Sequence, residues 1–236
     1  MVSSLEETRK EGGYGIARMF LDGRFYFWVC LVIVGFVYVS GVLCGRAMPF
    51  YSHNEGYGDF VKILISAPFL FYFGARHTLE PSTGSWRNAA KRNMLGFALP
   101  FFIALHWFYL QSIPQINYSL TPQDLMRMHP VGKAVFIGAG LLILGLAVYH
   151  FVLAHREKIL VKYACALVGA IGLLAAVSWV LRDHYYVHIH HYFLFGFFIP
   201  FARFRNPVSL VCQALCAGVF VEGVSEWSMG ALWYAY

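Results

Sequence analysis

Residues 25–44 read FYFWVCLVIVGFVYVSGVLC, an uncharged run of 20 residues that is bracketed by Arg24 and Arg46. A helix that crosses the hydrocarbon core of a bilayer needs about 20 apolar residues. The stretch therefore predicts a membrane-spanning helix, and it decides the class of protein to which the chain belongs.

The composition of the whole chain points the same way. Of the 236 residues, 59% are hydrophobic and 13% are charged, and the mean hydropathy is +0.58. A soluble domain is about 45–50% apolar and about 25% charged, so this chain has too few polar residues to cover a surface in water. The composition excludes a soluble enzyme and a disordered chain, and it leaves a polytopic membrane protein.

Six further apolar segments predict additional spans. They are Val61–Gly74, Met94–Ile113, Ala134–Ala154, Ile159–Leu181, Tyr192–Phe204 and Val208–Trp227. The second and sixth of the seven spans are short, and a re-entrant segment is the alternative for each. The predicted fold is an all-α integral membrane helix bundle with about seven transmembrane segments.

The basic residues divide unequally between the two faces of this bundle. With seven spans, 13 Lys and Arg fall on the side of the N-terminus, here called side A, and five fall on the opposite side, side B. Cytoplasmic loops carry the excess of positive charge. We expect residues 1–24 to form an N-terminal segment on the cytosolic side, and residues 25–236 to form one transmembrane domain that ends on side B; the organelle is left open.

Histidines gather where the sixth span begins, on side B, in the stretch DHYYVHIHH at residues 183–191. In a helix, His184, His188 and His191 would share one face and His190 would point elsewhere. Three imidazoles on one face suit a zinc, iron or copper ion. In an extended chain, His188 and His190 would share a face instead and the triplet would be lost.

Two carboxylates should lie at the same depth as these histidines. Glu222 and Glu226 are four residues apart near the end of the seventh span, and the sixth and seventh spans should form an antiparallel hairpin. Carboxylates inside a span are rare and usually face a partner or a cavity. Glu222 is therefore a further candidate metal ligand, and either glutamate is a candidate catalytic base for a metal-bound water.

Structural interpretations stay open beside these. The histidines and tyrosines fit an interfacial belt, and the glutamates fit ion pairs with Arg182 or with histidines. His106 in the third span fits a hydrogen-bonded packing residue. The five cysteines all lie in apolar runs without a CxxC pair, and they fit buried small hydrophobic residues.

One part of the chain resembles a known family. The series HIHHY at 188–192, PVSL at 207–210, Gln213, Gly218 and VEGVSEW at 221–227 resembles the C-terminal membrane region of fungal LCCL-domain membrane proteins. The chain has Ser228 after Trp227 where that family tends to have Gly, and it has no equivalent of the soluble LCCL domain. The resemblance implies a shared membrane module.

Three functions fit this sequence. The first is an accessory or structural subunit of a larger membrane complex, with membrane lipids and other subunits as partners and no nucleic acid. The second is a metal-binding membrane protein or a metal-dependent enzyme that acts on a lipid-like substrate at the non-cytosolic interface. The third is a transporter or channel, for which no pair of interrupted spans is seen.

Overall fold

The computed structural model describes residues 16–45, 54–81, 85–113 and 126–235 of the chain. The expected N-terminal segment 1–24 lies mostly outside this part. The α-helices are α2 (Ile16–Met19), α3 (Gly23–Val37), α4 (Asn54–Leu70), α5 (Arg76–Thr78), α6 (Trp86–Asn93), α7 (Leu99–Ala104), α9 (Pro130–Arg156), α10 (Leu160–Leu181), α11 (His191–Phe198) and α12 (Pro207–Trp227). π-Helical stretches are η1 (Tyr38–Leu43), η2 (Phe71–Ala75) and η3 (Met94–Ala98), and η4 (Trp107–Ser112) is a 3₁₀ helix.

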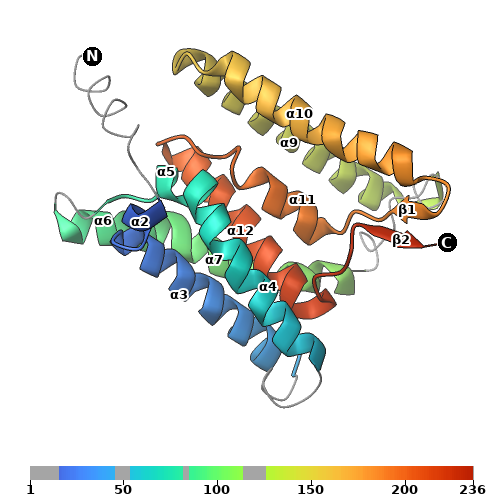
Figure 1. Ribbon diagram of the computed structural model, residues 1–236, viewed down its shortest axis with the longest axis horizontal. Coiled ribbons are helices and arrows are strands. Elements are labelled where there is room, and N and C mark those ends of the chain that lie inside the picture. Colours follow the sequence, from blue (N-terminus) through green and yellow to red (C-terminus); the bar gives the residue numbers. More distant parts are fainter. Residues whose placement is uncertain (1–15, 46–53, 82–84, 114–125, 236) are drawn as a thin grey trace.

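The expected all-α fold is confirmed. In the described residues, strands are limited to a two-stranded antiparallel ribbon of β1 (Tyr185–Val187) and β2 (Trp233–Ala235). Every backbone polar group in a bilayer must be satisfied within the protein, and helices do this within one segment. The ribbon lies beyond the helices, at the end of the molecule where α11 begins (Figure 1).

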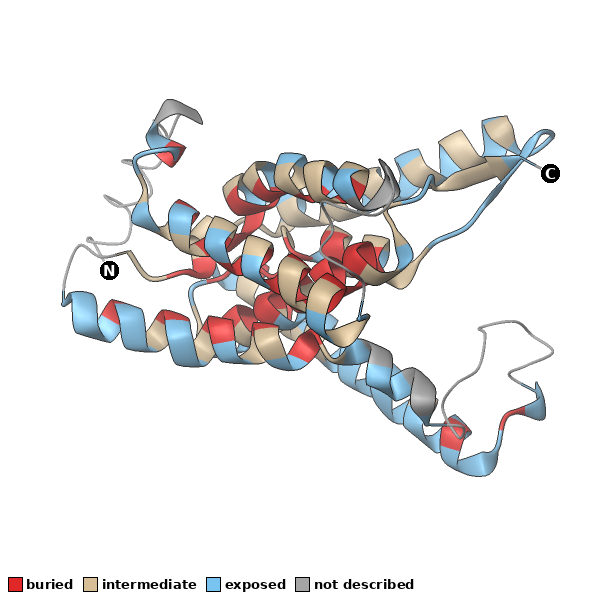
Figure 2. Ribbon diagram, turned by 90° about the horizontal axis from the view of Figure 1, so that it is seen from below, coloured by how far each residue is buried: buried red, intermediate tan, exposed pale blue. Residues whose placement is uncertain are grey.

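Helix α12 forms the centre of the bundle, with α3, α4, α7 and α11 around it (Figure 1). In the most apolar stretch of 18 residues in α12, 72% of the residues are buried. The corresponding share is 39% for α3–η1 and 39% for α4–η2–α5. The buried residues gather in the middle of the molecule (Figure 2). Large side chains that are almost fully buried include Trp28, Phe36, Phe71, Phe97, Phe101 and Phe204.

Helices α9 and α10 form a hairpin that lies along one side of this bundle (Figure 1). Only 6% of the apolar window of α9 and 0% of that of α10 are buried. A few hydrogen bonds tie the hairpin to the body: His150 Nε2 lies 3.0 Å from Ser209 Oγ, Tyr163 donates to Phe201 O at 3.1 Å, and Trp233 donates to Ser178 at 3.1 Å.

Five helices in the described residues are long and apolar enough to cross a membrane. These are Gly23–Leu43, Tyr57–Thr78, Pro130–Arg156, Leu160–Leu181 and Pro207–Trp227. They correspond to the first, second, fourth, fifth and seventh predicted spans. The prediction that the second span is short is wrong, because its helix runs for 22 residues. The third predicted span is built from the shorter pieces η3, α7 and η4, with α6 directly before it, and the sixth contains only the eight-residue α11.

A π-helical stretch after Pro68 explains how the second predicted span can continue as one helix past its proline. Pro68 lies inside α4, where it lacks the N–H of an ordinary residue, yet the helix continues through it into η2. Membrane helices tolerate proline because local π adjustments and neighbouring side chains satisfy the freed backbone groups. Pro68 removes the helical bond to Leu64 O, and a separate contact holds the helix beside it, where Trp28 of α3 donates its indole N–H to Ala67 O at 2.9 Å.

The two ends of the bundle carry the charges that the sequence assigns to them. On side A, Arg24 donates to Arg76 O at 2.7 Å, and Arg92 pairs with Glu80 at 2.9 Å. At the opposite end, Lys62 pairs with Asp59 at 3.0 Å. The residues assigned to one side thus lie together, while the orientation in a membrane stays a prediction.

Candidate functional site

The histidine-rich stretch is extended, so the helical interpretation of His184, His188 and His191 is wrong. β1 pairs with β2 in the register Tyr185 with Ala235 and Val187 with Trp233, and His188 N donates to Leu232 O at 2.9 Å. Aromatic and β-branched residues favour strands, and a partner strand is available here. The alternative prediction for an extended chain applies instead.

His188 and His190 lie on one face of this extended segment, with ring centroids 4.3 Å apart. The His190 ring stacks on Tyr192 at 5.1 Å, and its Nε2 lies 3.4 Å from the Tyr234 hydroxyl. Burial first, and then the neighbouring His188 and His191, lower the pKa of His190 below 6.5. The folded state therefore favours the neutral form of the His190 side chain.

His191 is the histidine that reaches a carboxylate. It begins α11, and its Nε2 lies 3.3 Å from Oε2 of Glu222 on α12. The sixth and seventh segments thus bring this imidazole and this carboxylate to the same depth, as the predicted hairpin requires. Gly223 allows the close crossing, because a Cβ there would lie 2.6 Å from Tyr192 Cβ and 2.8 Å from His191 Nε2.

Glu222 is unusual because it is ionisable and fully buried. Its side chain is 0% exposed, whereas His191 is 28% exposed. Its second oxygen, Oε1, is buried and has no hydrogen-bond partner in the described part of the chain. As a carboxylate this oxygen lacks a donor or cation, and as an acid it would lack an acceptor, so neither protonation state satisfies it.

The other predicted ligands do not join this pair. His184 lies exposed in the turn before β1, and His188 and His190 contact each other and Tyr234. Glu226 lies one helical turn beyond Glu222 and is half-buried. Among the described residues, no three His, Cys, Asp or Glu side chains gather as a metal site. Zinc, iron or copper binding stays a prediction that rests on His191 and Glu222.

Two further histidines have packing roles. His106 Nδ1 donates to Phe102 O at 2.9 Å, which leaves Nε2 to accept from the Tyr38 hydroxyl at 3.1 Å. This is the role expected for His106. His150 is used in the same way, between Leu146 O at 2.7 Å and Ser209 Oγ at 3.0 Å.

Sequence reasoning missed a polar contact in the core. Gln213 of α12 is fully buried, donates to Ile199 O at 2.8 Å and accepts from the Thr78 hydroxyl. It joins α12 to α5 and to the turn after α11. A glutamine in an apolar span was the only signal of this contact in the sequence.

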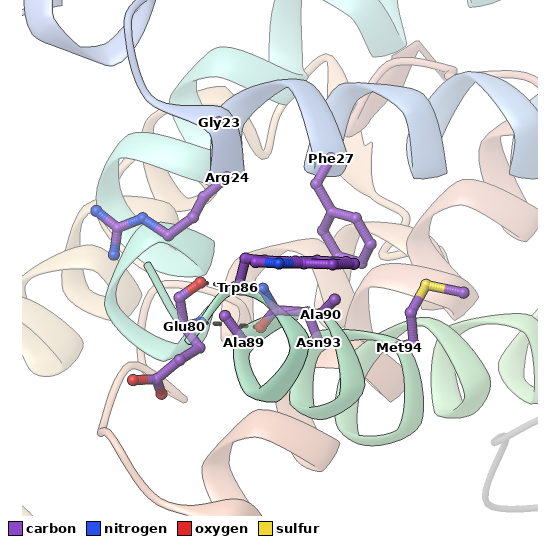
Figure 3. A pocket seen from close by; sticks show the side chains of 9 residues that line it. All are labelled: Gly23, Arg24, Phe27, Glu80, Trp86, Ala89, Ala90, Asn93 and Met94. Atoms are coloured by element: carbon purple, nitrogen blue, oxygen red, sulfur yellow. Dashed lines mark hydrogen bonds between the residues drawn. The ribbon is translucent and has the colours of Figure 1, made fainter. Parts of the chain in front are cut away.

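A hollow of about 250 Å³ lies at the side-A end, between α3 and α6 (Figure 3). Phe27, Trp86 and Met94 give it an apolar wall. Its charged residues already have partners, since Arg24 pairs with Asp22 at 2.7 Å and Glu80 pairs with Arg92. None of the predicted site residues lines it.

In comparisons with known proteins, no protein-family model, no curated protein and no solved structure matches the chain. The resemblance to fungal LCCL-domain membrane proteins therefore stays a prediction.

Proposed function

We propose that this protein is an accessory or structural subunit of a larger membrane complex, and that the α9–α10 hairpin packs against transmembrane helices of another chain. The observation that carries the proposal is the low burial of the hairpin, 6% for α9 and 0% for α10, beside 72% for α12. The two helices are as apolar as α3, yet their own chain hardly covers them.

The small residues on the α9–α10 hairpin favour contact with a partner helix over contact with lipid alone. A Cβ added at Gly138, Gly140 or Gly145 of α9, or at Gly169 or Gly172 of α10, would meet nothing within 4 Å. Association in a bilayer relies on close packing, and small residues let the backbones approach. Glycines that their own bundle does not use remain available to a partner helix.

Photo-cross-linking in native membranes tests this proposal. A photoreactive residue replaces Leu142 on α9 or Leu173 on α10, which are 64% and 67% exposed, and Ile65 on α4, which is 70% exposed, serves as the matched control. We expect protein adducts at Leu142 and Leu173 and lipid adducts alone at Ile65. Lipid adducts alone at all three positions, or adducts only between copies of this chain, would contradict the proposal.

A glycine substitution gives a second readout. Gly140→Leu should release the chain from its native assembly on native electrophoresis, because the larger side chain holds a partner helix away. Gly41→Leu places the same change at an open position of η1, where a Cβ also meets nothing within 4 Å, and it should leave the assembly intact. Equal behaviour of the two variants would contradict a role for the hairpin.

A further inference from the structure

We propose that the side-A end of the bundle holds a binding site for a phosphate group, built by Arg76, His77, Arg203 and Arg205. The inference is independent of the subunit function proposed above. It begins with the His77 ring, because both of its nitrogens face an arginine. Arg76 Nε lies 3.2 Å from His77 Nε2, and Arg203 Nη2 lies 3.4 Å from His77 Nδ1.

These two contacts cannot both be hydrogen bonds. A neutral imidazole accepts at one ring nitrogen and carries its proton on the other. If His77 Nε2 accepts from Arg76, then Nδ1 carries the proton and its N–H faces an N–H of Arg203. The other tautomer moves this conflict to Arg76, and a protonated ring has it at both contacts. An anion beside the ring removes the conflict, because it accepts from the imidazole N–H and from the guanidinium together.

Positive charge gathers around this ring. The ring lies in the electrostatic field of four guanidinium groups, those of Arg24, Arg76, Arg203 and Arg205. Asp22 pairs with Arg24 at 2.7 Å, so four arginines and one aspartate give the group a formal charge of +3. Guanidinium groups bind phosphate oxygens through parallel, charge-assisted hydrogen bonds. A phosphate group therefore matches both the charge and the excess of N–H donors.

The site is open to a ligand at the surface of the bundle. Arg76, His77 and Arg203 are half-buried and Arg205 is exposed. A phosphate group can therefore reach the guanidinium groups from the side-A surface, and the site does not require an enclosed cavity.

A buried contact fixes the two segments that meet at this ring. Gln213 donates to Ile199 O at 2.8 Å, in the turn that leads to Arg203, and it accepts from the hydroxyl of Thr78, which directly follows His77. Gln213 is 0% exposed. The histidine and the arginine are thus positioned by the core of the bundle, as a preformed binding site requires.

The site lies at the depth where a bilayer has its phosphates. Arg24 lies at the start of one candidate span, His77 at the end of a second, and Arg205 just before a third. Basic pockets where membrane helices end bind anionic lipid headgroups. A lipid headgroup and free phosphate share the chemistry that this site recognises, and the experiment distinguishes them.

Native mass spectrometry of the full chain in detergent counts the lipids that stay bound as dioleoyl phosphatidylglycerol is added. We expect one lipid that binds more tightly than the rest, with an affinity about tenfold lower in the double variant Arg203→Gln with Arg205→Gln. The matched control, Arg87→Gln with Lys91→Gln, removes the same charge from exposed positions of α6 at the same end. It should keep that lipid.

Inorganic phosphate identifies the source of the phosphate group. A tight lipid that excess phosphate displaces indicates a site for the free ion, and a tight lipid that stays bound indicates a headgroup site. Two results would overturn the proposal. One is a wild-type chain that binds neither the lipid nor phosphate more tightly than the Arg203/Arg205 variant. The other is an equal loss in the two double variants, because the effect would then come from overall charge.

Hydrogen exchange of the wild-type chain covers the case in which a variant fails to fold. Nanodiscs of phosphatidylcholine are compared with nanodiscs that also contain phosphatidylglycerol, and with the first nanodiscs in inorganic phosphate. Exchange should slow in residues 199–206 and stay unchanged in residues 86–93 of α6. Unchanged exchange of residues 199–206 under both conditions would overturn the site.

Discussion

Gly218 lies where α12 crosses α7, and its lack of a side chain sets how closely the two helices approach. A Cβ at this position would lie 2.6 Å from Ala104 Cβ and against the backbone oxygen of Phe101. A backbone atom inside a helix can shift only at an energetic cost. Small residues serve this purpose in membrane helices generally. The contact belongs to the centre of the bundle, so a change there should affect the whole fold.

We therefore expect Gly218→Ala to lower the free energy of unfolding by about 1–3 kcal/mol, the usual range for overpacking. The matched control is Gly172→Ala on α10, where the added methyl group meets nothing within 4 Å. Because alanine is the better helix former, this control should be neutral or stabilising by up to about 1 kcal/mol. Thermal unfolding in nanodiscs compares the two variants, and equal shifts would refute the packing argument.

Glu222 and His191 show how far single residues could be predicted. The spacing of spans six and seven was sufficient to predict that an imidazole and a carboxylate meet. The sequence could not predict which histidine it would be, because that depends on whether residues 184–190 are helical or extended. Two strands decide this, and β2 lies more than 40 residues farther along the chain than β1.

At the scale of elements, the β1–β2 ribbon depends on the neutral form of His190. Burial and the adjacent histidines lower the pKa of His190 from 6.5, so the unfolded segment binds a proton more readily than the folded one. The stabilisation by neutral His190 is complete above pH 6.5. It is lost as the pH falls through 6.5 toward the lower folded pKa.

Acidification from about pH 7.5 to about pH 5.5 should therefore lower the stability of the ribbon, so that it opens more often. Hydrogen exchange at the amide of His188, which bonds to Leu232 O at 2.9 Å, reports this opening after correction for intrinsic rates. His190→Asn should remove most of the pH dependence. His184→Asn, a change in the exposed turn outside the ribbon, should keep it. A pH dependence that persists in His190→Asn would rule out this residue as the titrating group.

The membrane spans could be predicted best where the length and hydropathy of a segment are enough to determine that it forms a spanning helix. The first, fourth, fifth and seventh predicted spans match helices that are long enough to cross a membrane. The second was predicted too short because Lys62 and Pro68 interrupt its apolar run. Lys62 pairs with Asp59, and a π-helical stretch follows the proline, so the helix continues past both. The hydropathy of the local sequence does not reveal this ion pair or this π-helical stretch.

For the whole molecule, the two ends of the bundle should face opposite sides of the membrane. Single cysteines at Arg87 and Asp183, both exposed and at opposite ends, test this in a background without the native cysteines. We expect an impermeant maleimide to label Asp183→Cys in intact cells or vesicles, and Arg87→Cys only after permeabilisation. Val34→Cys, exposed in the middle of α3, should stay unlabelled in both conditions. Labelling of Arg87→Cys and Asp183→Cys from the same side would contradict the topology.

The central position of α12 also has a consequence for biosynthesis. The ribosome delivers α3, α4, α7 and α11 to the membrane before α12, the helix against which all four pack. Until α12 is inserted, the faces of these earlier segments that later pack against α12 are covered only by lipid or by chaperones. Any chain that stops before Pro207 keeps those faces open, and cellular quality control would meet it as an unfinished protein.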